Sequence, residues 1–402
     1  MREDISKVLE NVGKVIIGKE EVLEKLLAGL LAGGHVLLED VPGTGKTKMA
    51  KALSASLGVD FGRIQFTPDM LPADITGMHI YSRETESFVW KEGPVFTNIL
   101  LADEINRATP RTQAGLLECM EERQVTVDGE TRKMDAPFFV IATQNPVETA
   151  GTFPLPEAQT DRFIMKLSMG LPDREEEIRI LETYKDKDPL PELKPVMSKK
   201  ELLSIKEEAE RVYVHPLVNG YLADIALATR KQEKIVMGVS PRGTLALMRC
   251  AKARACMEGR AYVVPDDVKK LASSVLAHRL VFSFGRSRQE EAVKLLEDIL
   301  AAVGPSICQD CYEVSEDVIR QFQKNFPEDC WDALFYQKEN QKYQLNLWKA
   351  NELIFYEAGI LPEHIAVTNL CTHCNSEILY SHRQAGDARG NLCAFLALNQ
   401  EV

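Results

Sequence analysis

The sequence lacks the features that would place it in several special classes of protein. It contains no run of about 18 apolar residues, the length that a membrane-spanning helix needs, so we expect no membrane span. Its first twenty residues, MREDISKVLENVGKVIIGKE, have no apolar core of the kind found in signal peptides. No internal repeat or low-complexity segment is present. We therefore predict a globular protein that stays in the cytoplasm.

Positive charge and early cysteines are also scarce. Lysine and arginine number 48 against 60 acidic residues, which gives a net charge of -12 and a pI of about 5.3. A nucleic-acid-binding domain needs a basic surface, so we expect no nucleic-acid partner. Only Cys119, Cys250 and Cys256 of the nine cysteines precede residue 300. This argues against a disulfide framework, and the six later cysteines indicate a different domain there.

The pattern of apolar residues predicts an α/β fold with a parallel sheet. Apolar runs that end in polar residues occur at 35–40, 96–104 and 137–146, and we expect each to be a buried strand. Stretches with helical spacing alternate with them, beginning with a helix over residues 1–33. In such sheets ligands bind at the carboxyl ends of the strands, where these polar residues lie.

The loop after the first predicted strand, VPGTGKT (41–47), has the pattern of a phosphate-binding loop. Its backbone N–H groups and the following helix N-terminus would bind phosphate oxygens, and the glycines would allow close approach. Lys46 would reach the β- and γ-phosphates of ATP, and Thr47 would bind Mg²⁺. A surface glycine turn is the alternative, and Asp40 stands where the general motif has glycine. The predicted nucleotide-contacting residues of this segment are Val41, Pro42, Gly43, Thr44, Gly45, Lys46, Thr47 and Lys48.

The second predicted strand ends in two adjacent acids, Asp103 and Glu104. Downstream of a phosphate-binding loop, Asp103 is placed to hold Mg²⁺ through water, and Glu104 to orient the attacking water. Phosphoryl transfer depends mostly on positioning and charge stabilisation, so this pair is what ATP hydrolysis needs. The alternative is a solvated acidic strand end.

Three further residues fit a nucleotide-sensing role. Asn145, at the end of the third strand, could bond the γ-phosphate or the lytic water, or it could simply begin an Asn-Pro turn. Arg162 has no obvious phosphate in its own chain and could act on a neighbouring subunit, or pair with Asp161 or Glu157. Arg242, in the first turn of a later helix, could touch the γ-phosphate or have no ligand.

These segments resemble the MoxR branch of the AAA+ ATPases over residues 1–302. The matching strings include HVLLEDVPGTGKT, NILLADEINRATPRTQAGLLECMEERQVTVDG, FFVIATQNPVETAGTFPLPEAQTDRF and VSPRGTLALMRCAKARA. The resemblance implies that Asn145 is sensor 1, Arg162 the arginine finger and Arg242 sensor 2. It further implies that Val15 to Gly18 flank the adenine, with Ile17 and Gly18 in contact with the nucleotide. It also implies a pore-facing hairpin at 74–95, a ring that is usually a hexamer, a protein client and sometimes a von Willebrand A-domain partner.

The last hundred residues pose a separate question. Cys308-x-x-Cys311 and Cys371-x-x-Cys374, with His373 and His382 nearby, suggest zinc. The long gap between the pairs favours ordinary thiols instead. VGPSICQDCYEVSEDVIRQF and IAVTNLCTHCNSEILYSHRQAGDARGNLCAFLAL resemble the C-terminal part of the laccase-domain (YfiH-like) family of polyphenol oxidases and purine nucleoside phosphorylases. The His, Cys, His metal site of that family has no matching region here, so its activity does not carry over.

The expected organisation is an AAA+ αβα ATPase core at 1–185, a linker at 186–197, a helical lid at 198–302 and a partial laccase-like α+β segment at 303–402. The expected function is Mg²⁺-dependent ATP hydrolysis coupled to remodelling or assembly of a protein client. Two alternatives stay open. One is a nucleotide-switched scaffold with little turnover, and the other is an enzymatic activity of the C-terminal segment on purine nucleosides or phenols.

Overall fold

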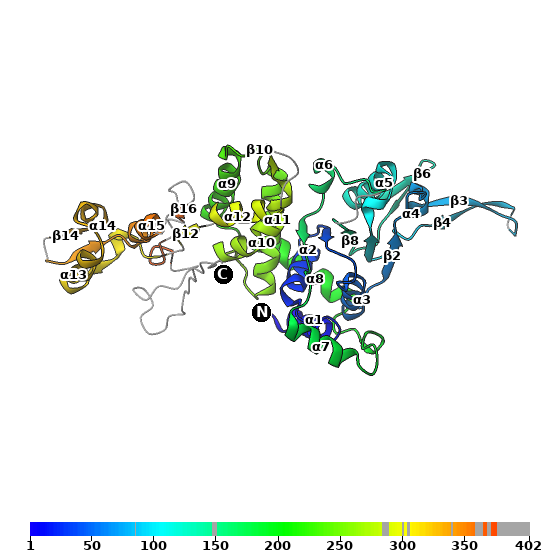
Figure 1. Cartoon of the computed structure of the whole chain (residues 1–402), viewed down its shortest axis with the longest axis horizontal. Helices are drawn as coiled ribbons and strands as arrows, with labels where there is room; N and C mark the ends of the chain where they lie inside the picture. Colours follow the sequence, from blue (N-terminus) through cyan, green and yellow to red (C-terminus); the bar gives the residue numbers. More distant parts are fainter. Residues whose placement is uncertain are drawn as a thin grey trace. The chain divides into compact units, whose positions relative to one another are not determined.

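The computed structural model describes residues 1–84, 86–146, 151–283, 289–299, 301–303, 306–338, 341–357, 365–367 and 371–375. Its chain divides into two compact units (Figure 1). The first comprises Met1–Val214 and Glu233–Val293, and the second comprises His215–Gln232 and Lys294–Val402.

A five-stranded parallel sheet forms the centre of the first unit, with the strand order β2-β5-β8-β1-β9. The middle strands are almost entirely buried, as is expected when helices cover both faces of a parallel sheet. The strands are β1 (Val36–Glu39), β2 (Phe61–Gln65), β5 (Ile99–Asp103), β8 (Phe139–Gln144) and β9 (Met165–Leu167).

Helices and two hairpins complete the N-terminal part of this unit. The hairpin of β3 (Gly77–Ser82) and β4 (Ser87–Glu92) projects away from the sheet (Figure 1). A second hairpin joins β6 (Gln124–Val127) to β7 (Glu130–Lys133). The helices are α1 (Glu3–Gly13), α2 (Glu20–Leu31), α3 (Lys46–Leu57), α4 (Pro72–Thr76), α5 (Pro110–Glu122), α6 (Glu157–Thr160) and α7 (Arg174–Tyr184), with short 3₁₀ turns at Ile105–Arg107 and Leu190–Glu192.

The following segment is largely helical, as predicted. Pro241 and Pro265 stand at the first positions of α10 and α11, where a missing backbone N–H costs nothing. The Ser240 side chain caps α10 by accepting a hydrogen bond from Gly243 N–H, which is 3.3 Å away. The elements are α8 (Lys199–Arg211), α9 (Pro216–Lys231), β10 (Ile235–Met237), α10 (Pro241–Met257), α11 (Pro265–Leu276), a 3₁₀ turn (Ala277–Arg279), β11 (Val281–Phe282) and α12 (Gln289–Ile299).

The second unit contains short strands and helices around a small apolar cluster. Val314, Ile319 and Leu345 are its buried members, and Tyr312, Phe322 and other partly buried side chains pack against them. One sheet has the order β13-β15-β14, and β12 pairs with β16. Besides α9 and the end of α12, the elements of this unit are β12 (Ala301–Val303), η4 (Gln309–Cys311), β13 (Glu313–Val314), α13 (Glu316–Asn325), η5 (Glu328–Cys330), α14 (Trp331–Leu334), β14 (Phe335–Gln337), β15 (Tyr343–Leu345), α15 (Leu347–Glu357) and β16 (Ile365–Val367).

Two details differ from the sequence prediction. Residues 1–33 form two helices, α1 and α2, because the helix ends at Gly13 and the chain turns at Gly18, whose φ is +70°, before α2 begins at Glu20. The edge strands β2 and β9 carry no strong apolar run and were not predicted. The four-domain division stays a prediction, since the structure separates two units along other boundaries.

Candidate functional site

The loop after β1 has the backbone of a phosphate-binding loop. Gly43 and Gly45 both have φ of +88°, a left-handed conformation that favours glycine. The Lys46 amine lies 2.8 Å from the carbonyl oxygen of Asp40 and 3.4 Å from that of Val41, so it folds back over the loop. Burial lowers the pKa of Lys46, while the negative charges of nearby acids oppose that change. The lysine side chain is therefore placed where phosphate oxygens would replace the two carbonyls.

Asp40, the departure from the general motif, has a structural role of its own. Its carboxylate accepts hydrogen bonds from Ser168 Oγ and Met169 N, both at 2.7 Å, and from Gly170 N at 3.1 Å. The side chain is buried, and its backbone is not left-handed, so this position does not require glycine. Asp40 thus fastens the start of the loop to the segment that follows β9.

Asp103 and Glu104 stand at the carboxyl end of β5 and are joined through Thr143 of the neighbouring strand β8. The Thr143 hydroxyl accepts a hydrogen bond from Glu104 N–H at 2.9 Å and donates one to Asp103 Oδ1 at 2.7 Å. The other carboxylate oxygen of Asp103 pairs with Arg63, 2.7 Å away. One hydroxyl therefore fixes the relative position of the two acids.

Glu104 has the marks of a functional residue. It adopts φ 55° and ψ 50°, which is uncommon for a residue other than glycine and is often found at functional sites. Its Oε2 atom accepts a hydrogen bond from Gln65 Nε2 at 2.8 Å and pairs with Arg107 Nε at 3.1 Å. The side chains of Gln65 and Arg107 thus hold the Glu104 carboxylate at the carboxyl end of β5, and both contacts can be exchanged for others.

The phosphate-binding loop follows β1 and the two acids follow β5, and β8 lies between these two strands in the sheet. Both groups therefore lie at the carboxyl ends of the parallel strands. Asp40 N–H donates to Gln144 O at 3.2 Å, one residue beyond the Thr143 that contacts both acids. Adjacent strands are about 4.8 Å apart, so β1 and β5 lie roughly 10 Å from one another. Asn145 continues β8 at this edge and is buried, and its carbonyl accepts from Asn106 Nδ2 at 3.4 Å.

Arg162 and Arg242 meet at one carboxylate. Arg162 Nε lies 3.3 Å from Glu121 Oε2, and Arg242 Nη2 lies 2.9 Å from Glu121 Oε1. Arg162 therefore pairs with Glu121 and not with Asp161 or Glu157, the two partners that the sequence suggested. Both arginines are about one-third to one-half exposed, so a partner could reach them.

The buried side chain of Arg279 stabilises the segment that carries Arg162. Arg279, only 3% exposed, donates to the Asp161 carboxylate at 2.7 Å and to the carbonyl oxygens of Phe163 and Ile164 at 2.8 and 3.3 Å. Burial lowers the pKa of Arg279, and the carboxylate of Asp161 counteracts that. Because Asp161 precedes Arg162, this network fixes the backbone from which Arg162 extends.

The predicted adenine-flanking residues lie beside α7. Gly18 is half-buried with φ +70°, and a side chain there would collide with Glu176. The neighbouring Ile17 is also half-buried. The Tyr184 hydroxyl donates to Val15 O at 2.8 Å and so joins the end of α7 to the loop after α1. The Lys48 amine lies 3.8 Å above the Tyr184 ring and 3.2 Å from a carboxylate oxygen of Asp188.

Comparisons with known proteins agree with this geometry. Residues 35–165 match the model for the ATPase family associated with various cellular activities (AAA), and residues 227–299 match the AAA lid domain. The chain is 43% identical to the chaperone MoxR1 of Mycobacterium tuberculosis over 289 residues, which is 70% of this chain and 76% of that protein. The chain belongs to the MoxR family of AAA+ ATPases. It is an ATPase and binds nucleotide.

Other relatives of this MoxR protein cover the same region. The Bacillus subtilis protein YeaC is 47% identical over 300 residues, which is 74% of this chain and 94% of YeaC. A solved structure of a candidate ATPase from Cytophaga hutchinsonii is similar with a TM-score of 0.68 and 39% identity, and it covers 73% of this chain and 93% of that one. The predicted fold class and enzyme class are therefore confirmed.

The C-terminal region has relatives of a different kind. Residues 282–399 match the model for the multi-copper polyphenol oxidoreductase laccase family. The purine nucleoside phosphorylase YlmD of Bacillus subtilis is 33% identical over 103 residues, which is 26% of this chain and 36% of that protein. The predicted laccase-domain resemblance is confirmed, and this chain spans about a third of that relative.

Several residues of the MoxR site were missed by sequence reasoning. Thr143, Gln65, Arg63 and Glu121 contact the predicted catalytic groups. Thr143 offered one signal, since it precedes Asn145 by two residues at the end of a buried strand. The others lie on a weakly apolar strand or on an exposed helix face, where the pattern gives no signal.

Within the described ranges, none of the helices has the length and apolar character that crossing a bilayer requires.

Proposed function

We propose that this MoxR protein couples Mg²⁺-dependent ATP hydrolysis to the remodelling or assembly of a protein client. The observation that carries the proposal is the meeting of the phosphate-binding loop and the two acids at one sheet edge, through Thr143 and Gln144 of β8. Thr47 and Asp103 offer the oxygen ligands that Mg²⁺ prefers. Bound there, Mg²⁺ would neutralise charge on the phosphates.

Each of the protein's own groups has a defined task in this proposal. Lys46 leaves the carbonyl oxygens of Asp40 and Val41 and binds the β- and γ-phosphate oxygens of ATP. Glu104 leaves Gln65 and Arg107 and orients the attacking water. Asn145 reports the presence of the γ-phosphate at the end of β8. These exchanges replace internal hydrogen bonds by charge-assisted bonds to the substrate.

Arg162 and Arg242 act in different directions in this proposal. Arg242 contacts the γ-phosphate of its own subunit from the first turn of α10, whereas Arg162 serves the neighbouring subunit. Glu121, which pairs with both, holds them while no phosphate is near. An arginine supplied in trans is worth about 10³–10⁵ in rate, so hydrolysis would require a ring, expected to be a hexamer.

The projecting hairpin supplies a surface for the client. Tyr81 and Phe88 are paired edge to face near its tip, with ring centroids 5.6 Å apart, yet they are 56% and 71% exposed. Exposed aromatic pairs of this kind commonly bind other proteins. At its base, His79 Nδ1 lies 2.8 Å from Asp128 Oδ2 of the second hairpin, so the two hairpins are joined. A von Willebrand A-domain protein is a further proposed partner.

Mixed-subunit ATPase assays test this function. Turnover should require Mg²⁺ and should vanish in Lys46→Ala and in Glu104→Gln, while Glu104→Gln should still bind ATP. Mixing Arg162→Ala with Glu104→Gln chains should restore part of the activity, because some interfaces then combine an intact Glu104 with an intact Arg162. Absence of rescue would show self-contained sites, and Mg²⁺-independent or negligible turnover would favour a nucleotide-switched scaffold. Mass photometry with and without ATP measures the ring size.

A further inference from the structure

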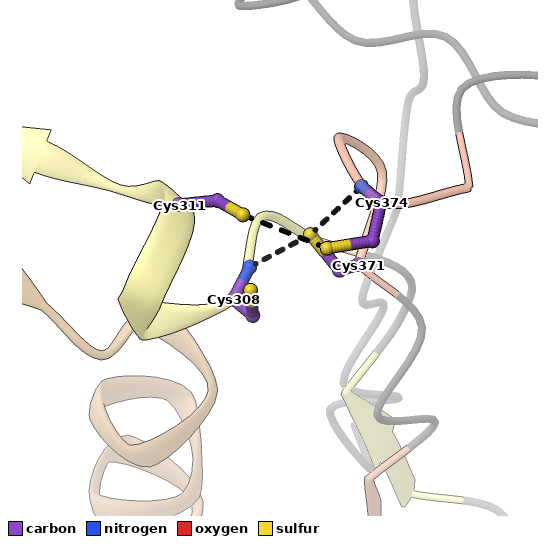
Figure 2. Close-up of side chains that lie close together, drawn as sticks. All are labelled: Cys308, Cys311, Cys371 and Cys374. Carbon is purple, nitrogen blue, oxygen red and sulfur yellow. Dashed lines mark hydrogen bonds between the residues drawn. The ribbon is translucent and has the colours of Figure 1, made fainter.

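Four cysteine side chains from distant parts of the sequence converge in the second unit. Cys308 immediately precedes the turn η4 and Cys311 is its last residue, and Cys371 and Cys374 come from the turn at 371–375. Their sulfur atoms all lie within 4.8 Å of one another, and the sulfurs of Cys311 and Cys374 are 3.5 Å apart (Figure 2). Cys311 and Cys374 are 63 positions apart in the sequence, a separation that argued against a metal site, yet the fold brings the two pairs together.

The separations match a tetrahedral metal site. A Zn–S bond is about 2.3 Å, so the sulfurs of a tetrahedral four-cysteine site lie about 3.8 Å from one another. A disulfide would need about 2.05 Å, and each of these cysteines is free. All four sulfurs face a common centre in Figure 2. Paired C-x-x-C units are a usual source of four thiolate ligands.

Backbone N–H groups surround one of the four sulfurs. The N–H groups of Cys308 and Cys374 both donate to the sulfur of Cys371, at 3.3 Å each. Hydrogen bonds donated to a sulfur stabilise its negatively charged, metal-binding form.

Both turns are held by contacts that do not involve the sulfurs. Thr372 N–H donates to Ser306 O at 3.2 Å, which brings the second C-x-x-C turn beside the start of the first. Gln344 Nε2 donates to Asp310 O at 3.3 Å, and Leu345 N–H donates to Tyr312 O at 3.1 Å. The first turn is thus tied to β15, whose Leu345 belongs to the small apolar cluster.

We propose that Cys308, Cys311, Cys371 and Cys374 together bind one Zn²⁺ ion as a closed structural site that fastens the C-terminal region. Four thiolates in tetrahedral array select zinc or iron, whereas copper(II) sites use imidazole. His373 lies between two of the cysteines in sequence but is not part of the cluster, and His382 lies outside the described residues. With four protein ligands, no position stays open for a substrate, so the role is structural.

Metal analysis of the full-length chain tests the site. Protein purified under reducing conditions without added metal should contain one zinc per chain by mass spectrometry. Cys374→Ser should lower zinc affinity by about 10²-fold or more, and Cys374→His should restore stoichiometric zinc, because Cys₃His is also a common ligand set. Cys330→Ser changes a cysteine outside the cluster and should keep one zinc. Cobalt substitution should give the visible spectrum of a tetrahedral four-thiolate site in the wild type and in Cys330→Ser, but not in Cys374→Ser.

The opposing outcomes are equally definite. Stoichiometric iron or copper in place of zinc would overturn the assignment, as would a mapped disulfide within the cluster or full zinc retention in Cys374→Ser. Less than one zinc per ten chains that resists reconstitution would do the same. Folding of the serine variant is checked by circular dichroism and by the histidine variant. Since Lys46→Ala should keep its zinc, failure here is distinguishable from failure of the proposed ATPase function.

Discussion

The ATPase region and the C-terminal region reach stability by different means. In the ATPase region, the fully buried sheet residues Leu37, Leu100 and Val140 belong to an extended cluster of buried side chains. In the C-terminal region, the described core cluster has Val314, Ile319 and Leu345 as its buried members, and four thiols meet nearby. Small cores seldom suffice alone, and proteins that have them often add disulfides or metals.

The difference also separates two uses of polar groups. At the edge of the parallel sheet, charged groups are held by internal partners that a phosphate could replace. In the cysteine cluster, the ligand atoms face inward and leave no free position. The first arrangement suits a site that exchanges ligands, and the second suits a site that holds one ion permanently. A change in one region should therefore leave the property of the other region unaltered.

The largest expected effect comes from the phosphate loop. Lys46→Ala should reduce ATP hydrolysis by about 10²–10³-fold or more, since it removes a preorganised charge from the transferring phosphate. Zinc content should not change. Lys51→Ala, which removes an exposed lysine of the same helix, should keep activity within a few-fold. A steady-state phosphate-release assay measures this, and loss of zinc in Lys46→Ala would break the comparison.

The buried arginine should control stability of the ATPase region. Arg279→Met should lower the free energy of unfolding by about 3 kcal/mol, because it leaves Asp161 and the carbonyl oxygens without their donor. Arg211→Met removes an exposed pair with Glu207 and should cost under about 0.5 kcal/mol. Urea titration followed by fluorescence gives both values. Equal effects of the two changes would contradict the assigned role.

Acid should destabilise the ATPase region through His35. Burial lowers its pKa to about 4, while the unfolded value is about 6.5. Between these values the unfolded chain binds the proton and the folded chain does not, so stability falls as pH decreases below about 6.5. The loss at pH 5 should be about 2 kcal/mol. His35→Gln should flatten this part of the profile in urea titrations at pH 7 and pH 5, and an unchanged slope would refute it.

The smallest effect concerns the carboxylate shared by two arginines. Glu121→Gln removes the charge that holds Arg162 and Arg242, and it should lower the KM for ATP by up to about fivefold, as expected for surface pairs worth up to about 1 kcal/mol. Glu122→Gln, an exposed neighbour, is the matched control. ATPase kinetics at two salt concentrations measure the change, and a raised KM would contradict it.

The sequence predicted what strong patterns specify. β1, β5 and β8 have long apolar runs because both of their faces are buried, and each was predicted within three residues at its ends. The edge strands β2 and β9 are short or partly exposed and gave no such pattern. Their positions follow from pairing with neighbours, which is a tertiary effect.

The residues of the candidate site could be predicted from the sequence, but the contacts between them could not. The loop glycines, Lys46 and the two acids follow from motif and spacing. That Thr143 joins the acids, or that Glu121 holds both arginines, depends on which elements meet in space. The cysteine cluster shows the same limit, because the spacing of the two pairs along the chain gave no sign that the fold brings these distant turns together.

The proline-rich segment between α7 and α8 packs against the part of the ATPase region that contains the five-stranded sheet. Val196 and Met197 donate their N–H groups to Ser56 O at 2.9 and 3.2 Å, and Asn11 Nδ2 donates to Lys194 O at 3.1 Å. Ser56 lies near the C-terminal end of α3, the helix that begins at Lys46, roughly 15 Å along its axis. If the start of α3 moves when phosphate binds, the rigid helix would therefore transmit that movement to the residues just before α8.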